Sequence, residues 1–206
     1  MSAAPGPFSA IVLAGGRSSR FGRDKLAEPL AGRPLLDHAV RSVAGVARDV
    51  VILGPGLPVS SPAGSMAVPR GVTVRFVPDA EPFAGPLVAL AAGLGLVREP
   101  LTLVVGGDMP TLSPLLLDAL VRALEEADGC GAAALLLAGR AQPLPLAIRV
   151  RAASPVVHRL VAGGERRLGA LLEAVAMRQL DETDWRPLDP DAATLRDVDV
   201  PADLPR

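Results

Sequence analysis

The residues with the clearest chemical meaning lie in one loop near the start of the chain. The stretch AIVLAGGRSSRFGRDK, residues 10–25, runs from apolar residues into two adjacent glycines, and its last nine residues carry Arg17, Arg20, Arg23 and Lys25. Glycines let backbone N–H groups approach an anion closely, and clustered cations neutralise several negative charges together. The pattern indicates a cradle for a polyphosphate, with a tight turn that holds no ligand as the alternative.

Two familiar phosphate loops do not fit this stretch. A Walker A motif needs G-x-x-x-x-G-K-[ST], but the fourth and fifth residues after Gly16 are Arg20 and Phe21. A dinucleotide fingerprint needs G-x-G-x-x-G, whereas the glycines here are adjacent. What remains is L-A-G-G-x-S-x-R-x-G-x-D-K, residues 13–25.

Two carboxylates follow apolar runs that read as strands. Asp108 ends LTLVVGGD, and Asp79 follows VTVRFVP. If these strands run parallel to the first, their carboxyl ends share the edge at which Gly15 and Gly16 lie. A carboxylate that faces polyphosphate needs a hard cation between the charges, and Mg²⁺ takes few carboxylates together with phosphate oxygens. We expect Asp108 to hold Mg²⁺; a simple turn role is the alternative for both residues.

No covalent nucleophile stands out in the sequence. His38 and His158 are far apart and fit helix faces or the surface. The chain shows no Ser-His-Asp pattern and no zinc-ligand spacing. Phosphoryl and nucleotidyl transfer can proceed by positioning and charge neutralisation alone, so this chemistry remains open.

The elements that must position these residues alternate along the chain. Short runs rich in Val, Ile and Leu are separated by Ala/Leu-rich segments, the pattern of buried parallel strands with crossover helices. The sequence therefore predicts an α/β fold: a single-domain, open, mostly parallel sheet flanked by helices, Rossmann-like. The predicted strands are FSAIVLA, VVILG, VTVRFVP and LTLVVGGD, then AAALLLA, LPLAIR and MRQL; the predicted helices are 34–44, 86–97, 113–127 and 154–175, the last broken at AGGE.

The chain length and the remaining segments suit one domain. With 206 residues, one core is the default, so we assign residues 1–206 to one domain with a disordered tail at 1–7. Many of the 21 glycines and 21 prolines gather in residues 54–71. That length is unusual for a connection inside a domain and predicts a mobile flap or a disordered excursion.

Composition limits the partners and the compartment. The net charge is −1 and the chain has no Tyr, which argues against nucleic acid or an anionic membrane as a partner. Cys130 is the sole cysteine, so neither an intrachain disulfide nor a cysteine metal site can form. The first apolar run is too short for a secretory signal or a membrane span. We therefore expect a soluble, cytoplasmic protein.

The loop motif resembles the signature of nucleotidyltransferases and is most similar to the molybdenum cofactor guanylyltransferases. Further stretches along most of the chain carry the same resemblance: GRPLLDHAV, PDAEPFAGPLVAL, GGDMP, QPLPLAI, GERRL and DVDVPADL. In that family, GTP binds across the glycine-rich loop and Mg²⁺ binds the Asp of the DMP segment. A guanylyl group then passes to the terminal phosphate of the molybdenum-loaded pterin.

The resemblance implies roles for individual residues. Asp197 and Asp199, where the family generally has asparagines, would lie on the pterin side. The implied catalytic residues are Arg20, Lys25 and Asp108, and the implied nucleotide-binding residues are Leu13, Ala14, Gly15, Gly16, Lys25, Asp79, Gly85 and Asp108.

Several alternatives remain open at this point. The chain could use CTP on the same pterin or act on a sugar phosphate, or it could be a non-catalytic GTP-binding accessory protein. The motifs LAGG and GPL look like the guanine-using branch. The implied partners are therefore GTP, molybdopterin and proteins of molybdenum cofactor synthesis or their acceptors.

Overall fold

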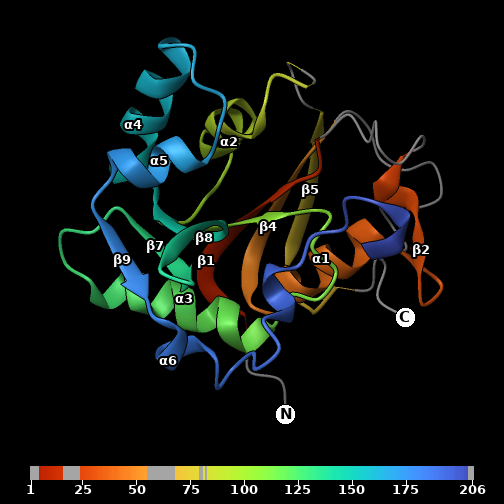
Figure 1. Cartoon of the computed structure of the whole chain (residues 1–206). Coiled ribbons are helices and arrows are strands. Elements are labelled where there is room, and N and C mark those ends of the chain that lie inside the picture. Colours follow the sequence, from red (N-terminus) through yellow and green to blue (C-terminus); the bar gives the residue numbers. More distant parts are fainter. Residues whose placement is uncertain (1–4, 16–23, 55–67, 79–80, 82, 204–206) are drawn as a thin grey trace.

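The computed structural model describes residues 5–15, 24–54, 68–78, 81 and 83–203 (Figure 1). Among these residues, one seven-stranded sheet has the order β5-β4-β1-β6-β8-β7-β9. Neighbouring strands are parallel except along β8, which is antiparallel to both β6 and β7. The predicted open, mostly parallel sheet flanked by helices is therefore confirmed. The sheet strands are β1 (Gly6–Leu13), β4 (Ala47–Gly54), β5 (Thr73–Pro78), β6 (Leu101–Gly106), β7 (Ala132–Leu137), β8 (Arg140–Arg149) and β9 (Met177–Leu180).

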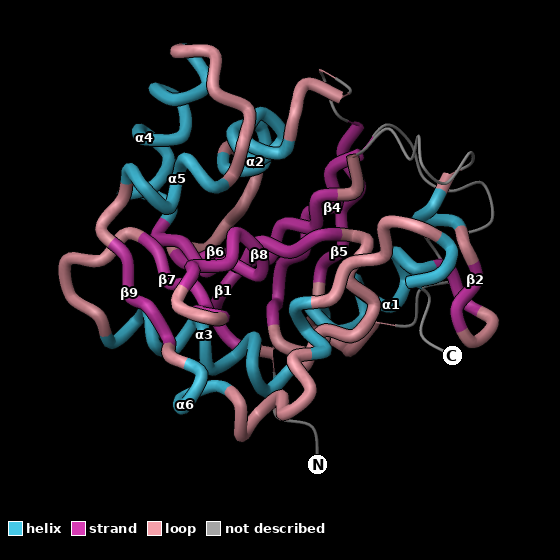
Figure 2. Tube along the Cα trace, in the orientation of Figure 1, coloured by secondary structure: helices cyan, strands magenta, loops and turns pink. Residues whose placement is uncertain are grey.

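Helices cover both faces of this sheet, as Figures 1 and 2 show. α1 and α3 pack in one hydrophobic cluster, whereas α2, α4 and α5 pack in a second cluster. The helices are α1 (Leu35–Ala44), α2 (Pro86–Leu94), α3 (Pro114–Glu126), α4 (Val150–Ala162), α5 (Gly169–Ala174) and the short α6 (Glu182–Trp185). A two-stranded hairpin joins β2 (Pro29–Leu30) to β3 (Arg33–Pro34), and 3-10 turns occupy Lys25–Ala27, Ala193–Leu195 and Pro201–Asp203.

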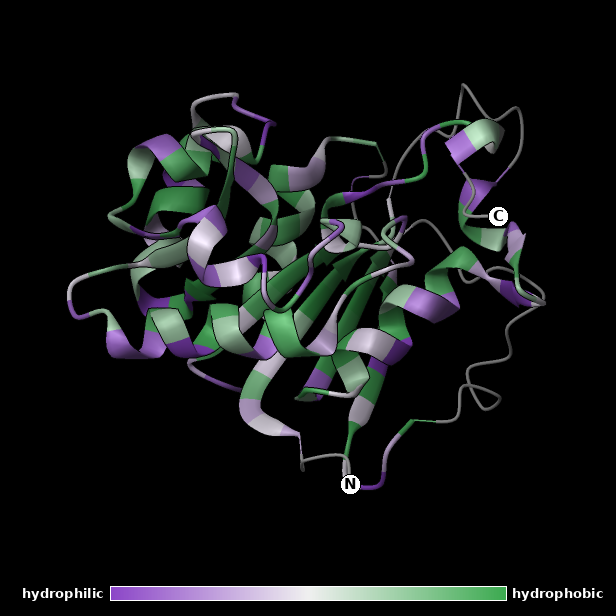
Figure 3. Ribbon diagram, turned by 60° about the horizontal axis from the view of Figure 1, so that its bottom comes forward, coloured by the Kyte–Doolittle hydropathy of each residue, from purple (hydrophilic) through white to green (hydrophobic). Residues whose placement is uncertain are grey.

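β1 shows why the central strands are mostly apolar (Figure 3). Ala10 and Val12 face the α1–α3 cluster, while Ile11 and Leu13 face the cluster of α2, α4 and α5. Successive side chains of a strand point to opposite faces, so a strand covered on both sides is hydrophobic at most positions. Ser9, a buried polar residue of β1, donates its hydroxyl to the Asp49 carboxylate of β4. The central strands thus form a buried layer whose ends are its accessible parts, whereas the edge strands β5 and β9 are partly exposed.

Some element boundaries differ from the expectations. α4 begins at Val150, before the expected residue 154, and accommodates Pro155 within the helix. α2 stops at Leu94 because Gly95 follows as its C-cap. β8 begins at Arg140, earlier than expected, since Ala138 and Gly139 adopt positive φ angles of 50° and 73° and form a tight hairpin turn.

Two expectations concern segments at the limits of the described residues. The expected tail at 1–7 is too long, because β1 already begins at Gly6, whose N–H donates to the Val46 carbonyl at 2.6 Å. Most of the predicted flap at 54–71 lies outside the described residues; Gly54 ends β4. In the part of the chain that the structure describes, every helix is too short or too polar to span a membrane.

Candidate active site

The carboxyl ends of the central strands meet around Ala14. Its N–H donates to the Leu53 carbonyl at 2.6 Å, and the Gly107 N–H donates to the Leu13 carbonyl at 2.9 Å. A side chain at Gly54 would lie 2.9 Å from the Ala14 carbonyl oxygen, so glycine is required for this approach. The end of β4 and the first residues after β1 and β6 are therefore packed backbone against backbone.

This packing confirms that Gly15 and Asp108 lie at the same edge of the sheet. It also reduces the number of backbone amides that are available to bind an anion. Because β1 and β6 are parallel, with Leu13 opposite Gly106, Asp108 emerges at the same edge as Gly15. The Ala14 N–H already serves the Leu53 carbonyl and cannot also donate to a phosphate. The amides expected to meet an anion thus reduce to Gly15, which is exposed, and to the residues after it.

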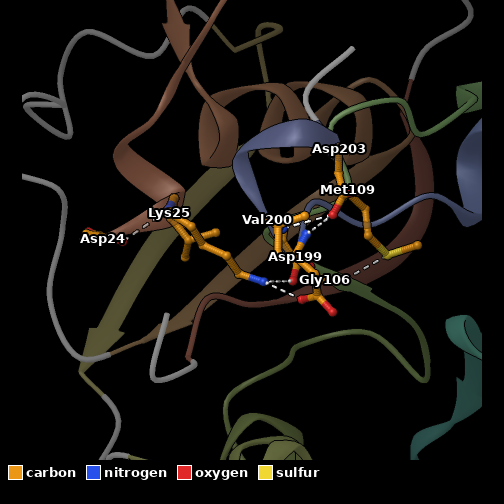
Figure 4. A network of polar contacts seen from close by, with 9 residues as sticks. Asp24, Lys25, Gly106, Met109, Asp199, Val200 and Asp203 are labelled. Atoms are coloured by element: carbon orange, nitrogen blue, oxygen red, sulfur yellow. Dashed lines mark hydrogen bonds and ion pairs between the residues drawn. The ribbon is translucent and has the colours of Figure 1, made fainter. Parts of the chain in front are cut away.

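Lys25 lies between two of the candidate carboxylates. Asp24 caps the turn that presents it, because its carboxylate accepts the Leu26 N–H at 3.1 Å. The Lys25 Nζ is 2.7 Å from Asp108 Oδ2 and 3.2 Å from Asp199 Oδ1. Figure 4 shows the lysine side chain extended toward Asp199. The structure therefore brings one predicted phosphate cation into direct contact with the predicted metal ligand.

The side chains of Asp108, Asp197 and Asp199 lie together, and we call this cluster of three carboxylates the carboxylate group. Each offers one oxygen, and these oxygens lie within 4.8 Å of one another. Carboxylate oxygens are hard ligands suited to Mg²⁺, which binds through a few carboxylates and completes its shell with water or phosphate. The donor set present therefore fits the metal that the family resemblance implies.

Charge interactions in this group shift two pKa values. Burial acts to lower the pKa of Lys25, but its hydrogen bonds and charge interactions with Asp108 and Asp199 together raise that pKa above 10.5. Desolvation, then repulsion from Asp108, raises the pKa of Asp197 above 3.8. At neutral pH Lys25 therefore carries a positive charge. The ionised form of Asp197 is destabilised by its partial burial and by the negative charge of Asp108.

Gly85 is held by another segment of the chain. It has φ 111° and ψ 158°, and the Leu87 N–H that follows it donates to the Arg166 carbonyl at 3.1 Å. A side chain at Gly85 would lie 2.9 Å from Arg166 Cβ. The loop of Arg166 and Arg167, organised by the Glu165 carboxylate, thus covers the N-terminus of α2. The contact with Arg166 explains why glycine is needed at residue 85, which could not be inferred from the sequence.

The predicted site residues fall into three sets. The structure brings together Leu13, Ala14 and Gly15 at one strand edge, with Lys25 and the carboxylate group beside them. Gly85 packs against the Arg166 loop. Gly16, Arg20 and Asp79 lie outside the described residues.

Several residues that shape the site were not predicted from the sequence. Asp203 accepts the N–H groups of Asp199 and Val200 at 2.9 and 2.8 Å, and Asp189 and Thr194 organise the segment before them. The DVDVPADL stretch carried Asp203, but no spacing rule pointed to its capping role.

The two histidines lie on helices, His38 on α1 and His158 on α4, as expected from the sequence. His38 Nε2 is 2.8 Å from the Leu30 carbonyl oxygen, and His158 Nδ1 is 2.7 Å from the Ser154 carbonyl oxygen.

The contact at Gly85 generates a stability prediction. Gly85→Ala should lower the free energy of unfolding by about 2–4 kcal/mol, because it adds backbone strain and a clash with Arg166. Gly139→Ala is the matched control: its φ is also positive, at 73°, but a side chain there meets nothing within 4 Å. That control should cost about 1–2 kcal/mol. Urea unfolding followed by circular dichroism measures both, and equal losses would contradict the role of Arg166.

The raised pKa of Asp197 generates a second prediction. A carboxyl whose folded pKa exceeds the unfolded 3.8 stabilises the protein below that pH and loses this stabilisation as pH rises through the folded pKa. Asp197→Asn should therefore raise the melting temperature of the metal-free protein at neutral pH by roughly 1–2 °C. The difference should vanish below pH 3.8. Asp191→Asn, at an exposed position in the same part of the chain, is the control and should change little.

Comparisons with known proteins identify relatives of this chain. A model of the MobA-like NTP transferase domain matches residues 10–182, which run from β1 into α6. A probable molybdenum cofactor guanylyltransferase of Chloroflexus aggregans is 32% identical, covering 96% of this chain and 91% of that protein. A molybdenum cofactor guanylyltransferase of Pseudomonas putida is 34% identical, covering 87% and 91%.

Solved structures share the fold at lower identity. Molybdopterin-guanine dinucleotide biosynthesis protein A from Archaeoglobus fulgidus has a TM-score of 0.76 at 21% identity, covering 95% of this chain and 94% of that one. The 2-C-methyl-D-erythritol 4-phosphate cytidylyltransferase from Thermus thermophilus has a TM-score of 0.65 at 19% identity, covering 94% of each chain. From its sequence match over residues 10–182 and its curated relatives, this chain belongs to the MobA-like NTP transferase family.

Proposed function

We propose that this protein transfers GMP from GTP to molybdenum-loaded molybdopterin, with Mg²⁺, and releases pyrophosphate. The observation that carries the proposal is the position of Lys25 between Asp108 and Asp199, at the strand edge next to Gly15. A charged lysine beside a set of metal-binding carboxylates suits a substrate that carries several phosphates. The curated relatives named as molybdenum cofactor guanylyltransferases support the choice of substrates.

The reaction itself needs no protein nucleophile. An oxygen of the pterin phosphate attacks the α-phosphorus of GTP, the bond from that phosphorus to the β-phosphate oxygen breaks, and pyrophosphate leaves. Negative charge grows on the leaving group in this step, so fixed positive charges near it lower the barrier. Lys25, charged because of its carboxylate partners, is one such group. We assign the same role to Arg20, from its place in the loop motif.

Asp108 would hold Mg²⁺ together with Asp197 and Asp199. When bound, the metal supplies positive charge to the phosphate oxygens of the nucleotide. We assign Asp197 and Asp199 to the metal rather than to the pterin, because unscreened carboxylates would repel an anionic pterin phosphate. Their closeness to Asp108 supports this revised assignment.

The nucleotide would lie along the edge formed by the ends of β1, β4 and β5. Gly15 and Gly16 would donate amides to the phosphates, with Leu13 and Ala14 shaping the wall below them. Asp79, directly after β5, would contact the nucleoside. Gly85 would border the same region through the backbone at the start of α2.

A nucleotide-selectivity assay tests this function. The protein is incubated with Mg²⁺, molybdopterin and each of GTP, CTP, ATP and UTP separately, and pyrophosphate is measured. We expect GTP to exceed each alternative by about ten- to a hundredfold, because other bases leave buried acceptors in a guanine site unpaired. Equal use of CTP would identify a cytidylyltransferase. GTP binding without pyrophosphate release would identify an accessory protein instead.

The role of Lys25 has its own matched test. Lys25→Met should reduce kcat/KM for GTP on the order of 10²-fold, because it removes a charge that stabilises the departing pyrophosphate. Arg33→Met removes a cation from an exposed position in the adjacent hairpin and should change kcat/KM by no more than about threefold. Both are assayed at saturating Mg²⁺. Similar losses in the two variants would show that Lys25 acts only through overall charge.

A further inference from the structure

Asp197 and Asp199 come from a segment that contains little regular structure. They flank Val198, which is 2% exposed and whose N–H donates to the Asp108 carbonyl at 3.0 Å. This backbone hydrogen bond links the segment that carries Asp197 and Asp199 directly to the backbone of Asp108. Like charges this close repel one another, so other contacts must hold the segment in place.

The first of these contacts is made by a buried threonine. Thr194 is 0% exposed, and its hydroxyl oxygen accepts the N–H of Ser113 at 2.9 Å. Its own N–H donates to Asp189 Oδ2 at 2.8 Å, and the Ala193 N–H donates to Asp189 Oδ1 at 3.0 Å. Asp189 is itself buried, with 6% exposed. The threonine is therefore held on one side by a carboxylate while it binds the Asp108 loop on the other.

The same loop makes further bonds to the segment. Thr111 Oγ1 donates to the Ala193 carbonyl at 2.7 Å, and Ser113 Oγ donates to the Leu188 carbonyl at 3.3 Å. Ser113 is also the N-cap of α3, where its hydroxyl accepts the Leu116 N–H. The C-terminal segment is thus attached to the point where the Asp108 loop enters α3, a 13-residue helix with one buried face.

We propose that Thr194 is a positioning residue for the carboxylate group. Its backbone N–H is held by Asp189 and its hydroxyl accepts the Ser113 N–H. These two bonds set where the segment crosses the Asp108 loop and so keep Asp197 and Asp199 within reach of Asp108. The inference rests on the proposed function, in which these three carboxylates hold a divalent cation. Partners that orient metal ligands typically change metal affinity by about 10–100-fold when they are replaced.

Thr194→Val tests the role with little change of shape. It leaves the Ser113 N–H without its acceptor and should weaken Mn²⁺ binding to the nucleotide-free protein by about tenfold. Calorimetry gives the dissociation constant, and circular dichroism shows that each variant is folded at the temperature used. Thr194→Ser keeps the hydroxyl and should restore binding.

The chain offers a matched control for the same substitution. Thr102 on β6 is also 0% exposed, but its hydroxyl has no hydrogen-bond partner among the described residues. Thr102→Val should therefore leave Mn²⁺ binding unchanged. An equal loss in Thr194→Val and Thr102→Val, or no loss in Thr194→Val, would overturn the proposal.

A double-mutant cycle shows whether Thr194 acts through the aspartates. In an Asp197→Asn, Asp199→Asn background, adding Thr194→Val should cause no further loss of Mn²⁺ affinity. The same tenfold loss in both backgrounds would mean a general structural effect and would overturn the role.

Hydrogen exchange separates this inference from the proposed function. The Val198 amide should exchange faster in metal-free Thr194→Val than in the parent, and at the parent rate in Thr102→Val. If the parent binds no Mn²⁺, the metal role in the proposed function fails, and exchange at Val198 still decides whether Thr194 fixes the segment. Unchanged exchange in Thr194→Val would overturn the positioning role alone.

Discussion

The ion pair between Lys25 and Asp108, 2.7 Å between Nζ and Oδ2, is the contact on which the candidate site depends. It joins the segment after β1 to the loop after β6. Asp199, near the C-terminus, adds a third segment, with its Oδ1 3.2 Å from Lys25 Nζ. Three carboxylates held so close are costly without cations, because each raises the energy of the others. Desolvation, then repulsion from Asp108, raises the pKa of Asp197. For Lys25, burial acts to lower the pKa, but attraction to Asp108 and Asp199 raises it, so the lysine charge offsets part of the repulsion. In the proposed function a bound cation relieves this repulsion, so the arrangement would serve binding rather than stability.

The sheet provides the rigid part of this arrangement. β1 is buried on both faces and pairs in parallel with β4 and β6, so the carboxyl ends of these three strands are fixed relative to one another. Ala14 packs between them, and Gly54 leaves room for its carbonyl. The described part of the chain after α6 contains no strand and is held by side-chain bonds together with the backbone bond from Val198 to Asp108. Two halves of one site are thus fixed by different kinds of interaction.

The sequence was sufficient for the parts that follow from local pattern. Apolar runs predicted the central strands, and the rule that parallel strands end at one edge correctly placed Asp108 beside Gly15. The starts of β8 and α4 were predicted too late: β8 already begins at Arg140 after the turn at Ala138 and Gly139, and α4 begins at Val150 and accommodates Pro155 within the helix. The position of Asp197 and Asp199 could not be read, because it depends on Thr194 and Ser113, which are 81 residues apart. The family model itself stops at residue 182.

The reversed direction of β8 has a consequence for the length of α4. β8 ends at the amino edge of the sheet, where the Val150 N–H donates to the Pro100 carbonyl, so α4 starts at the edge opposite the site. Its 13 residues, about 20 Å of helix, carry the chain back until Arg166 meets the start of α2. The length of α4 thus fixes the position of Arg166. One inserted residue would advance Arg166 by about 1.5 Å and rotate it by about 100°, so this helix tolerates changes of residue type far better than changes of length.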